Sequence, residues 1–223
     1  MFKANIGIID IDMGNMFSVL RACEQVDLTP VLTSNNKSLN IYDALILPGV
    51  GAFGEAMKNL KRLDLIYPIK DFIANGKPFM GICLGMQLLF SESEEFGSQK
   101  GIGVLGGGVV SLPSKDRRDN VVKVPQVGWN KIIFNKEAGG FPILDNVKDG
   151  AYMYFVHSYY VVPEKKQNIA TLTDYADVNF CSSVVCGNVS AFQFHPEKSA
   201  EQGLQIYKNF KNVVLHGRKN RND

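Results

Sequence analysis

The 223-residue chain has little of several things that define whole classes of protein. It contains four cysteines, three histidines and one tryptophan, and its formal net charge is only +2. The cysteines form no CxxC pair, so we expect no disulfide framework. A net charge this small argues against a nucleic acid as the main partner. A zinc site on His157, His195 and His216 stays open, although no HExxH or His/Cys ligand spacing supports it.

Long apolar runs are also missing. No stretch of about 18 or more apolar residues is present, so we expect no membrane-spanning segment and no membrane partner. The N-terminus has no apolar core of secretory length and is interrupted by Asp10 and Asp12, which favours a cytoplasmic protein. With 45% hydrophobic and 21% charged residues, the composition is that of a folded globular chain, long enough to bury a core without a disulfide or metal.

Apolar runs alternate with helical patterns in the first half, which is typical of parallel strands joined by crossover helices. Strands are expected at Ile6–Ile11, Pro30–Thr33, Ala44–Leu47 and Pro78–Ile82. Helical periodicity is expected up to Gln25, from Met57 to Leu63, over Ile66–Ile73 and over Leu84–Phe90.

The second half has a different pattern. Short β-rich segments from Ile102 to Phe194 predict mostly antiparallel strands, and one helix is expected over about Ser199–Val214. We therefore predict an α/β fold. It is a single domain over residues 1–216 with a central, mainly parallel sheet flanked by helices, an antiparallel β-rich second half and a basic, frayed C-terminal tail over residues 217–223.

The segment GICLG, residues 81–85, lies where the fourth expected strand turns into a helix. Glycines on both sides of Cys83 permit the tight strand-turn-helix backbone that carries nucleophiles in other enzymes. The helix N-terminus would favour a thiolate there, and the amide of Leu84 would point toward an oxyanion formed on attack. The alternative is a small buried cysteine between two glycines that pack a helix.

Such a thiol needs a base, and three histidines are available. In QFHPEKS, residues 193–199, His195 and Glu197 would share one face of an extended segment, so that the carboxylate could hold the imidazole. His216 lies in the basic tail, and His157 has Tyr159 rather than an acid two positions on. His195 is therefore the best candidate, although this motif alone also fits an exposed ion pair at a strand exit.

A third segment, GVGAFG over residues 49–54, allows two interpretations. It matches the GxGxxG pattern, with Asp71 as a candidate ribose-binding acid, and so allows a dinucleotide-dependent oxidoreductase. That fingerprint belongs in the first βα turn, whereas a complete βαβ unit precedes this one. In the other interpretation its amides approach a small ligand beside Cys83, because neighbouring parallel strands end at one edge of the sheet.

Five segments carry a resemblance to a known family. PGVGAFG, GICLGMQLLF, PQVGWN, FVHSYY and QFHPEKS, in this order and spacing, resemble the class I (triad) glutamine amidotransferases, and among them the glutaminase subunits of imidazole glycerol phosphate synthase. The resemblance covers nearly the whole chain and implies that residues 1–216 form a glutamine amidotransferase type 1 domain. It implies that Cys83 attacks L-glutamine to form a thioester, that His195 transfers protons and that Glu197 orients His195. It implies no metal and no organic cofactor.

The same resemblance implies roles for further residues. The amides of Val50 and Leu84 would form the oxyanion hole. Ammonia would pass to a (β/α)8 synthase subunit, the heterodimer partner, which makes imidazole glycerol phosphate and an aminoimidazole carboxamide ribotide in histidine biosynthesis. The glutamine pocket would be lined by Gly49, Gly51, Gln87, His157, Ser158 and Tyr159, and the partner would be faced by Asn15, Trp129 and Lys198.

The sequence also departs from this family. Ile11 stands where an aromatic residue is expected, Gln126 stands where histidine is commoner, and SEEFGSQKGIGVL is similar to paralogues that serve sugar amidation. Those paralogues keep the triad, so these departures leave the predicted glutaminase activity unchanged and bear only on which acceptor reaction receives the ammonia. A glutaminase for a surface-sugar amidotransferase pair, the oxidoreductase and a catalytically silent binding module of the same fold therefore remain as alternatives.

Overall fold

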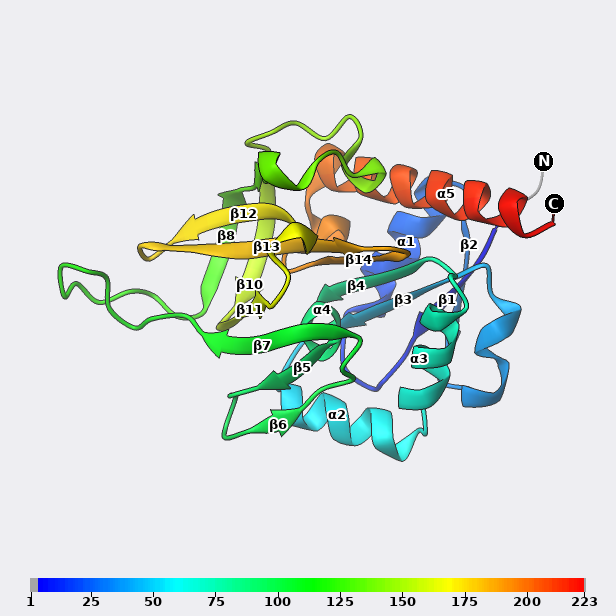
Figure 1. Ribbon diagram of the computed structural model, residues 1–223, viewed down its shortest axis with the longest axis horizontal. Helices are drawn as coiled ribbons and strands as arrows, with labels where there is room; N and C mark the ends of the chain where they lie inside the picture. Colours follow the sequence, from blue (N-terminus) through cyan, green and yellow to red (C-terminus); the bar gives the residue numbers. More distant parts are fainter. Residues whose placement is uncertain (1–3, 223) are drawn as a thin grey trace.

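The chain forms a twelve-stranded sheet with strands from both of its halves (Figure 1). The structure is a computed structural model and describes residues 4–222. The first three residues of the expected domain and the last residue of the expected tail lie outside this range. Five strands run parallel in the order β2-β1-β3-β4-β14. They are β1 (Asn5–Ile9), β2 (Thr29–Thr33), β3 (Ala44–Gly49), β4 (Phe79–Cys83) and β14 (Val189–Phe192).

The remaining strands extend the sheet beyond β14 in the order β13-β11-β7-β5-β6 and are mostly antiparallel; β12 pairs with β13, and β9 pairs with β12. Only the β5–β7 pair in this part is parallel among the described residues. Their bounds are β5 (Phe90–Ser93), β6 (Gln99–Lys100), β7 (Leu105–Ser111), β9 (Ile133–Phe134), β11 (Tyr159–Pro163), β12 (Ile169–Tyr175) and β13 (Val178–Cys186). The predicted α/β class is confirmed.

A separate two-stranded antiparallel ribbon lies beside the sheet. It consists of β8 (Gln126–Lys131) and β10 (Tyr152–His157), in a register that places Gln126 opposite His157 and Trp129 opposite Tyr154. This ribbon carries several of the residues for which the sequence suggests a function.

Helices cover both faces of the parallel strands, as the apolar patterns predict (Figure 1). The alternation along β3 shows why: Ala44 and Ile46 belong to one core cluster, and Leu45 and Leu47 to the other. The first cluster includes residues of α1 (Met16–Gln25) and α5 (Ala200–Asn222), and the second includes residues of α2 (Phe53–Arg62), α3 (Ile66–Ala74) and α4 (Leu84–Leu88). Short 3₁₀ turns lie at η1 (Asn36–Ile41), η2 (Lys136–Ala138), η3 (Pro142–Leu144), η4 (Lys166–Asn168) and η5 (Pro196–Lys198).

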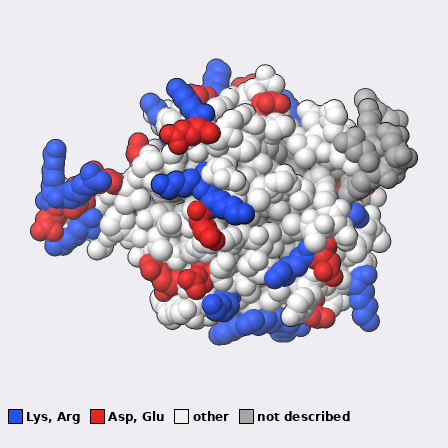
Figure 2. Space-filling model, in the orientation of Figure 1, with Lys and Arg blue, Asp and Glu red and all other residues white. Residues whose placement is uncertain are grey.

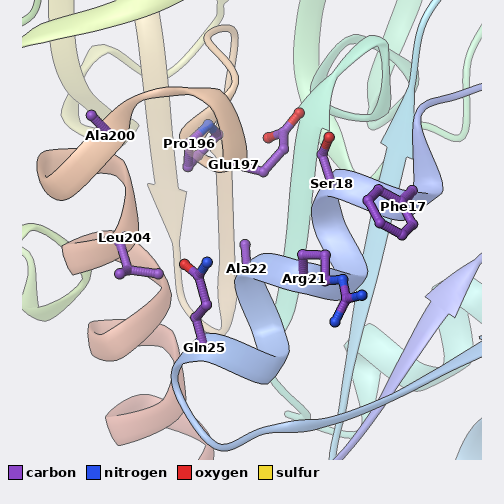
Figure 3. A pocket seen from close by; sticks show the side chains of 9 residues that line it. All are labelled: Phe17, Ser18, Arg21, Ala22, Gln25, Pro196, Glu197, Ala200 and Leu204. Atoms are coloured by element: carbon purple, nitrogen blue, oxygen red, sulfur yellow. The ribbon is translucent and has the colours of Figure 1, made fainter.

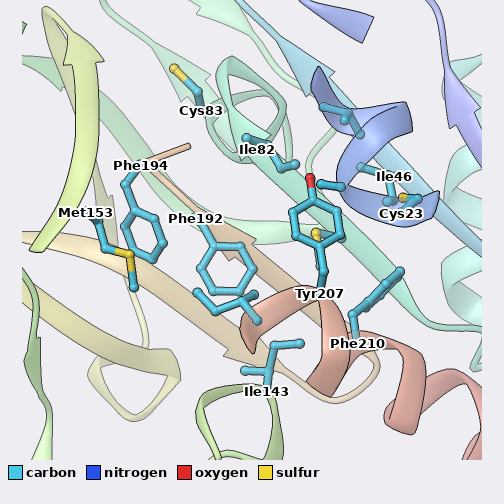
Figure 4. Packing of buried hydrophobic residues seen from close by; sticks show 14 of the residues in the cluster. Cys23, Ile46, Ile82, Cys83, Ile143, Met153, Phe192, Phe194, Tyr207 and Phe210 are labelled. Carbon is cyan, nitrogen blue, oxygen red and sulfur yellow. The ribbon is translucent and has the colours of Figure 1, made fainter. Parts of the chain in front are cut away.

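Aromatic side chains fill the first core beneath the end of β4. Phe192 and Phe194 pack beside Tyr207 and Phe210 of α5, and all four are buried (Figure 4). Cys83 belongs to the same cluster, so the end of β4 is anchored in a rigid core.

Two helix ends differ from the sequence prediction. The helix expected over Leu84–Phe90 ends at Leu88, and Phe90 begins β5, because Ile102 N–H donates to Leu88 O at 2.8 Å and Val104 N–H to Leu89 O at 2.9 Å. These distant donors take the carbonyls that another helical turn would need. The last helix, expected to end near Val214, runs to Asn222 and so includes most of the expected tail.

On the face seen in Figure 2, positive and negative side chains are interspersed. Among residues 4–222, none of the helices has the length and apolar character needed to cross a bilayer.

Candidate active site

Cys83 is the last residue of β4 and directly precedes α4. Its backbone has φ 54° and ψ −111°, a conformation that costs free energy for any residue with a Cβ and persists only where surrounding structure enforces it. The two glycines of GICLG permit this turn. A Cβ on Gly85 would lie 1.7 Å from Leu47 O, and one on Gly81 would lie 3.0 Å from Gly85 O. The structure therefore has the strand-turn-helix that the sequence predicts here.

His195 and Glu197 form a buried pair just beyond the neighbouring strand β14. His195 Nδ1 lies 2.7 Å from Glu197 Oε1, and the two side chains are 4% and 2% exposed. The carboxylate can only accept, so Nδ1 carries the proton and Nε2 is left for another group. That Nε2 atom is buried and has no hydrogen-bonding partner within residues 4–222.

The electrostatics of this pair favour a charged imidazole. Burial lowers the pKa of His195, but its interactions with Cys83 and Glu197 outweigh burial and raise the pKa above its usual value. The parallel register of β4 and β14 explains how Cys83 and His195 come together. Ile82 pairs with Phe192, so the segments that follow these two residues leave the sheet at the same edge.

A pocket of about 440 Å³ opens beside Cys83. It brings together seven of the residues expected in the oxyanion hole and glutamine pocket, namely Val50, Gly51, Leu84, Gln87, His157, Ser158 and Tyr159. Gly49 is not in its wall. It pairs with Cys83 in the β3–β4 register, and a Cβ there would lie 3.2 Å from Leu84 Cβ, so Gly49 permits the close approach of the two loops.

Glu95 also lines this pocket, and sequence reasoning missed it. Its Oε2 accepts from Phe53 N–H at 2.5 Å, at the start of α2, where Ala52 provides no side-chain cap. The two residues are 42 positions apart, and Glu95 lies in an acidic loop, so no local pattern distinguishes it from its neighbours. The pocket therefore has a carboxylate in its wall.

A buried amide network ends at Cys83. Gln87 Nε2 donates to Tyr159 O at 2.9 Å and to Gln193 Oε1 at 3.0 Å, and Gln193 Nε2 lies 3.7 Å from Cys83 Sγ. Gln87 therefore uses both N–H groups inside the protein and has only its carbonyl oxygen left for a ligand. Gln193 belongs to the QFHPEKS motif, but no sequence pattern indicates a function for it.

The three histidines lie in different environments. Burial lowers the pKa of His157 to about 4, and its ring bonds Tyr159 O at 2.9 Å and the Gln126 amide at 3.1 Å. His216 Nδ1 lies 2.7 Å from Asn212 O on α5. Across residues 4–222, no three His, Cys, Asp or Glu side chains gather into a group that could hold a metal ion.

Two of the three residues expected at the partner surface lie beside the same aromatic ring of the ribbon, that of Tyr154. Trp129 is 52% exposed and stacks edge-on against Tyr154 at 6.2 Å, and Lys198 Nζ lies 5.7 Å from the centre of the same ring. The Tyr154 ring is also 6.4 Å from His195. Asn15 is the N-cap of α1, where its side chain accepts from Ser18 N–H, and α1 packs against η5, the turn that contains Lys198.

A second hollow, of about 290 Å³, lies on another side of Glu197 (Figure 3). Phe17, Arg21 and Gln25 of α1 line it together with Glu197 and Leu204. Glu197 Oε2 is buried and has no hydrogen-bonding partner among the described residues. Glu197 thus borders this hollow and also contacts His195 through Oε1.

Known proteins resemble the chain in sequence and in fold. Residues 8–213 match the family model described as glutamine amidotransferase class-I. The chain is 49% identical to "Imidazole glycerol phosphate synthase subunit HisH" of Aquifex aeolicus over 92% of this chain and 94% of that protein, and 45% identical to the protein of the same name from Syntrophotalea carbinolica over 92% and 98%. A crystal structure of a glutamine amidotransferase superposes with a TM-score of 0.71 at 15% identity, covering 94% of this chain and 98% of that one.

Proposed function

The chain belongs to the class I glutamine amidotransferase family, among relatives that are imidazole glycerol phosphate synthase subunits, and we propose that it is the glutaminase subunit of such a synthase. It would act in the cytoplasm, with residues 1–216 as its glutamine amidotransferase type 1 domain. The observation that carries the proposal is the buried His195–Glu197 pair beside Cys83 at the end of β4.

The proposed chemistry begins at the Cys83 sulfur. The thiolate attacks the side-chain amide carbon of L-glutamine, and His195 gives a proton to the nitrogen that leaves as ammonia. A γ-glutamyl thioester remains on Cys83. Water then attacks it, with His195 taking the water proton, and glutamate leaves as the C–S bond breaks. Glu197 keeps the His195 proton on Nδ1 and stabilises the imidazolium.

The oxyanion formed in both attacks needs hydrogen-bond donors. The amide of Leu84, the residue after Cys83, is one proposed donor, and the amide of Val50 in the adjoining loop is the other. Both residues line the pocket, and Val50 is 39% exposed. We propose that the Val50 amide turns toward the oxyanion when the synthase subunit binds, so the isolated chain would be nearly inactive.

The pocket's chemistry suits the amino-acid end of glutamine. The Glu95 carboxylate offers a negative charge to the α-ammonium group. Gln87 Oε1, to which no group within residues 4–222 donates, is an acceptor nearby. Gly51, His157, Ser158 and Tyr159 form the rest of the proposed binding wall around Cys83. The neutral His157 fixes the shape of this wall by bonding Tyr159 O.

Ammonia requires an acceptor site, which we propose lies on a (β/α)8 synthase subunit that forms a heterodimer with this chain. The exposed Trp129 and the adjacent Lys198 are the proposed contacts near His195, with Asn15 at the start of α1 as a further contact. The product pair would be imidazole glycerol phosphate and an aminoimidazole carboxamide ribotide, in histidine biosynthesis.

The alternatives have less support. The relatives named above favour the histidine pathway over a surface-sugar pair. The Gly49–Gly54 loop contributes Val50 and Gly51 to the pocket that contains Cys83, which favours a role in glutamine binding over dinucleotide binding.

Glutamate release from glutamine tests the proposal. The purified chain alone should show very low turnover, and addition of a (β/α)8 synthase subunit should raise it, with loss of the activity in Cys83→Ala. Full turnover without a partner would contradict the proposal that the synthase subunit activates the glutaminase. Saturable dinucleotide binding in a fluorescence titration would instead favour the oxidoreductase.

A further inference from the structure

Gln193 is fully buried beside the Cys83 sulfur and has no role in the mechanism above. It follows β14 directly, and its N–H donates to Ser182 O of β13 at 2.9 Å, which fixes its backbone. Gln193 Nε2 lies 3.7 Å from Cys83 Sγ, and the His195 side chain also interacts with Cys83. Gln193 and His195 therefore both direct their side chains toward the nucleophile.

The orientation of the Gln193 amide is set by a backbone carbonyl. Tyr159 O can only accept, so the group of Gln87 that lies 2.9 Å away must be its NH₂. The same NH₂ lies 3.0 Å from Gln193, which must therefore present its oxygen. The NH₂ of Gln193 is then left facing Cys83 Sγ at 3.7 Å. A rotated Gln193 would place two NH₂ groups against each other.

A thiolate at this place has little water to solvate it, because Cys83 is only 5% exposed. A fixed N–H group replaces part of that lost solvation, and it does so without having to reorganise during the reaction. The positive charge of His195 acts on the same sulfur from another direction.

We propose that Gln193 is a further catalytic residue whose side-chain N–H stabilises the Cys83 thiolate, and that Gln87 is the positioning residue that orients it. The inference rests on the proposed role of Cys83 as nucleophile. The contact matters twice: before attack, when charge resides on sulfur, and on thioester hydrolysis, when the C–S bond breaks and its electron pair returns to sulfur.

The test measures the thiolate itself instead of turnover. The full chain is alkylated with iodoacetamide over a range of pH, and the rate at the Cys83 peptide is followed by mass spectrometry. Cys23 and Cys181 interfere little, because burial raises the pKa of both thiols. The half-buried Cys186 lies on another peptide and is resolved separately.

Three variants address the amide. Gln193→Met removes the donor at similar volume, and Gln193→Asn retains an amide but withdraws it from the sulfur. Both should raise the pH midpoint of Cys83 alkylation by about one unit, which slows alkylation roughly tenfold below the midpoint. Gln193→Glu should raise it further, because a carboxylate repels the thiolate.

Asn209→Ala is the matched control. Asn209 is a buried amide that donates to Ile143 O at 3.0 Å and Asp145 O at 2.7 Å, away from Cys83. Its loss should reduce thermal stability and leave the alkylation midpoint unchanged.

The outcomes separate this inference from the function on which it rests. An unchanged midpoint in Gln193→Met and Gln193→Asn, with native circular dichroism, would overturn the role of Gln193 while wild-type turnover still depends on Cys83. If glutamine hydrolysis persists in Cys83→Ala, the proposed function fails first, whatever the Gln193 variants show.

Discussion

The imidazole of His195 and the carboxylate of Glu197 lie 2.7 Å apart with both side chains almost completely buried. Such a pair holds the ring in one tautomer and stabilises its charged form. Glu197→Gln keeps the shape but replaces the carboxylate with a neutral amide, so we expect the rate of glutamine hydrolysis in the complex to fall roughly 10²–10⁴-fold. Steady-state turnover measures this. Near-normal turnover in a folded Glu197→Gln variant would show that Glu197 has no part in the mechanism.

The same pair predicts how stability depends on pH. Burial lowers the pKa of His195, but Cys83 and Glu197 outweigh it and raise the pKa from 6.5 to about 10. Because the folded state holds this proton more tightly, the stabilisation is fully present below pH 6.5 and is lost as pH rises toward 10. Urea denaturation at several pH values checks this. Wild type should lose stability relative to His195→Gln across that window, and parallel profiles would contradict the prediction.

The turn at Cys83 depends on Gly85. Since a Cβ there would lie 1.7 Å from Leu47 O, Gly85→Ala must displace backbone, and we expect a loss of about 1–3 kcal/mol in the free energy of unfolding. Gly140→Ala is the control, because a Cβ there meets nothing within 4 Å. Thermal denaturation compares the two. Equal stability of both variants would show that the close contact has no energetic consequence.

Glu95 should act on substrate binding. Glu95→Gln removes the charge proposed to meet the α-ammonium group, so KM for glutamine in the complex should rise about 10- to 100-fold. Glu94→Gln is the control, because Glu94 Oε1 bonds Ser111 N–H and Glu94 is not among the residues lining the pocket. A glutamine analogue without the α-amino group sharpens the test, since wild type and Glu95→Gln should then differ little. An unchanged KM for glutamine would place the ammonium elsewhere.

Trp129 should contribute to partner binding. The side chain is 52% exposed on the ribbon, and its burial by the synthase subunit would make it an anchor. Trp129→Ala should weaken binding by about 2 kcal/mol, measured by calorimetry, while the chain alone stays folded. Phe96→Ala, which truncates an 85% exposed side chain on the loop after β5, serves as control. Equal affinity of both variants for the synthase subunit would show that the interface does not include Trp129.

Sequence patterns predicted the features that depend on near neighbours. The apolar run Ala44–Leu47 predicted a strand, which the structure buries on both faces, and the glycines around Cys83 indicated a tight turn. His195 and Glu197 pair as predicted, but the expected extended segment was wrong, because Pro196–Lys198 forms a 3₁₀ turn that has His195 as its N-cap.

What the sequence did not reveal depends on contacts between distant segments. Glu95 meets Phe53 because the loop after β5 folds over the start of α2, and α4 ends early because Ile102 takes a carbonyl of its last turn. The role of Gln193 emerges only when Gln87 and Tyr159 O come together with it. None of these contacts has a local sequence signal.

Cys83 as the nucleophile is the step on which every other proposed role depends. A glutamine-analogue electrophile that reacts irreversibly with an activated thiol, followed by peptide mass spectrometry of the chain in complex with a synthase subunit, tests this most directly. We predict one adduct, on Cys83, formed in step with loss of glutaminase activity and prevented by excess glutamine. Labelling that persists in Cys83→Ala, or activity that survives full modification of Cys83, would contradict the account.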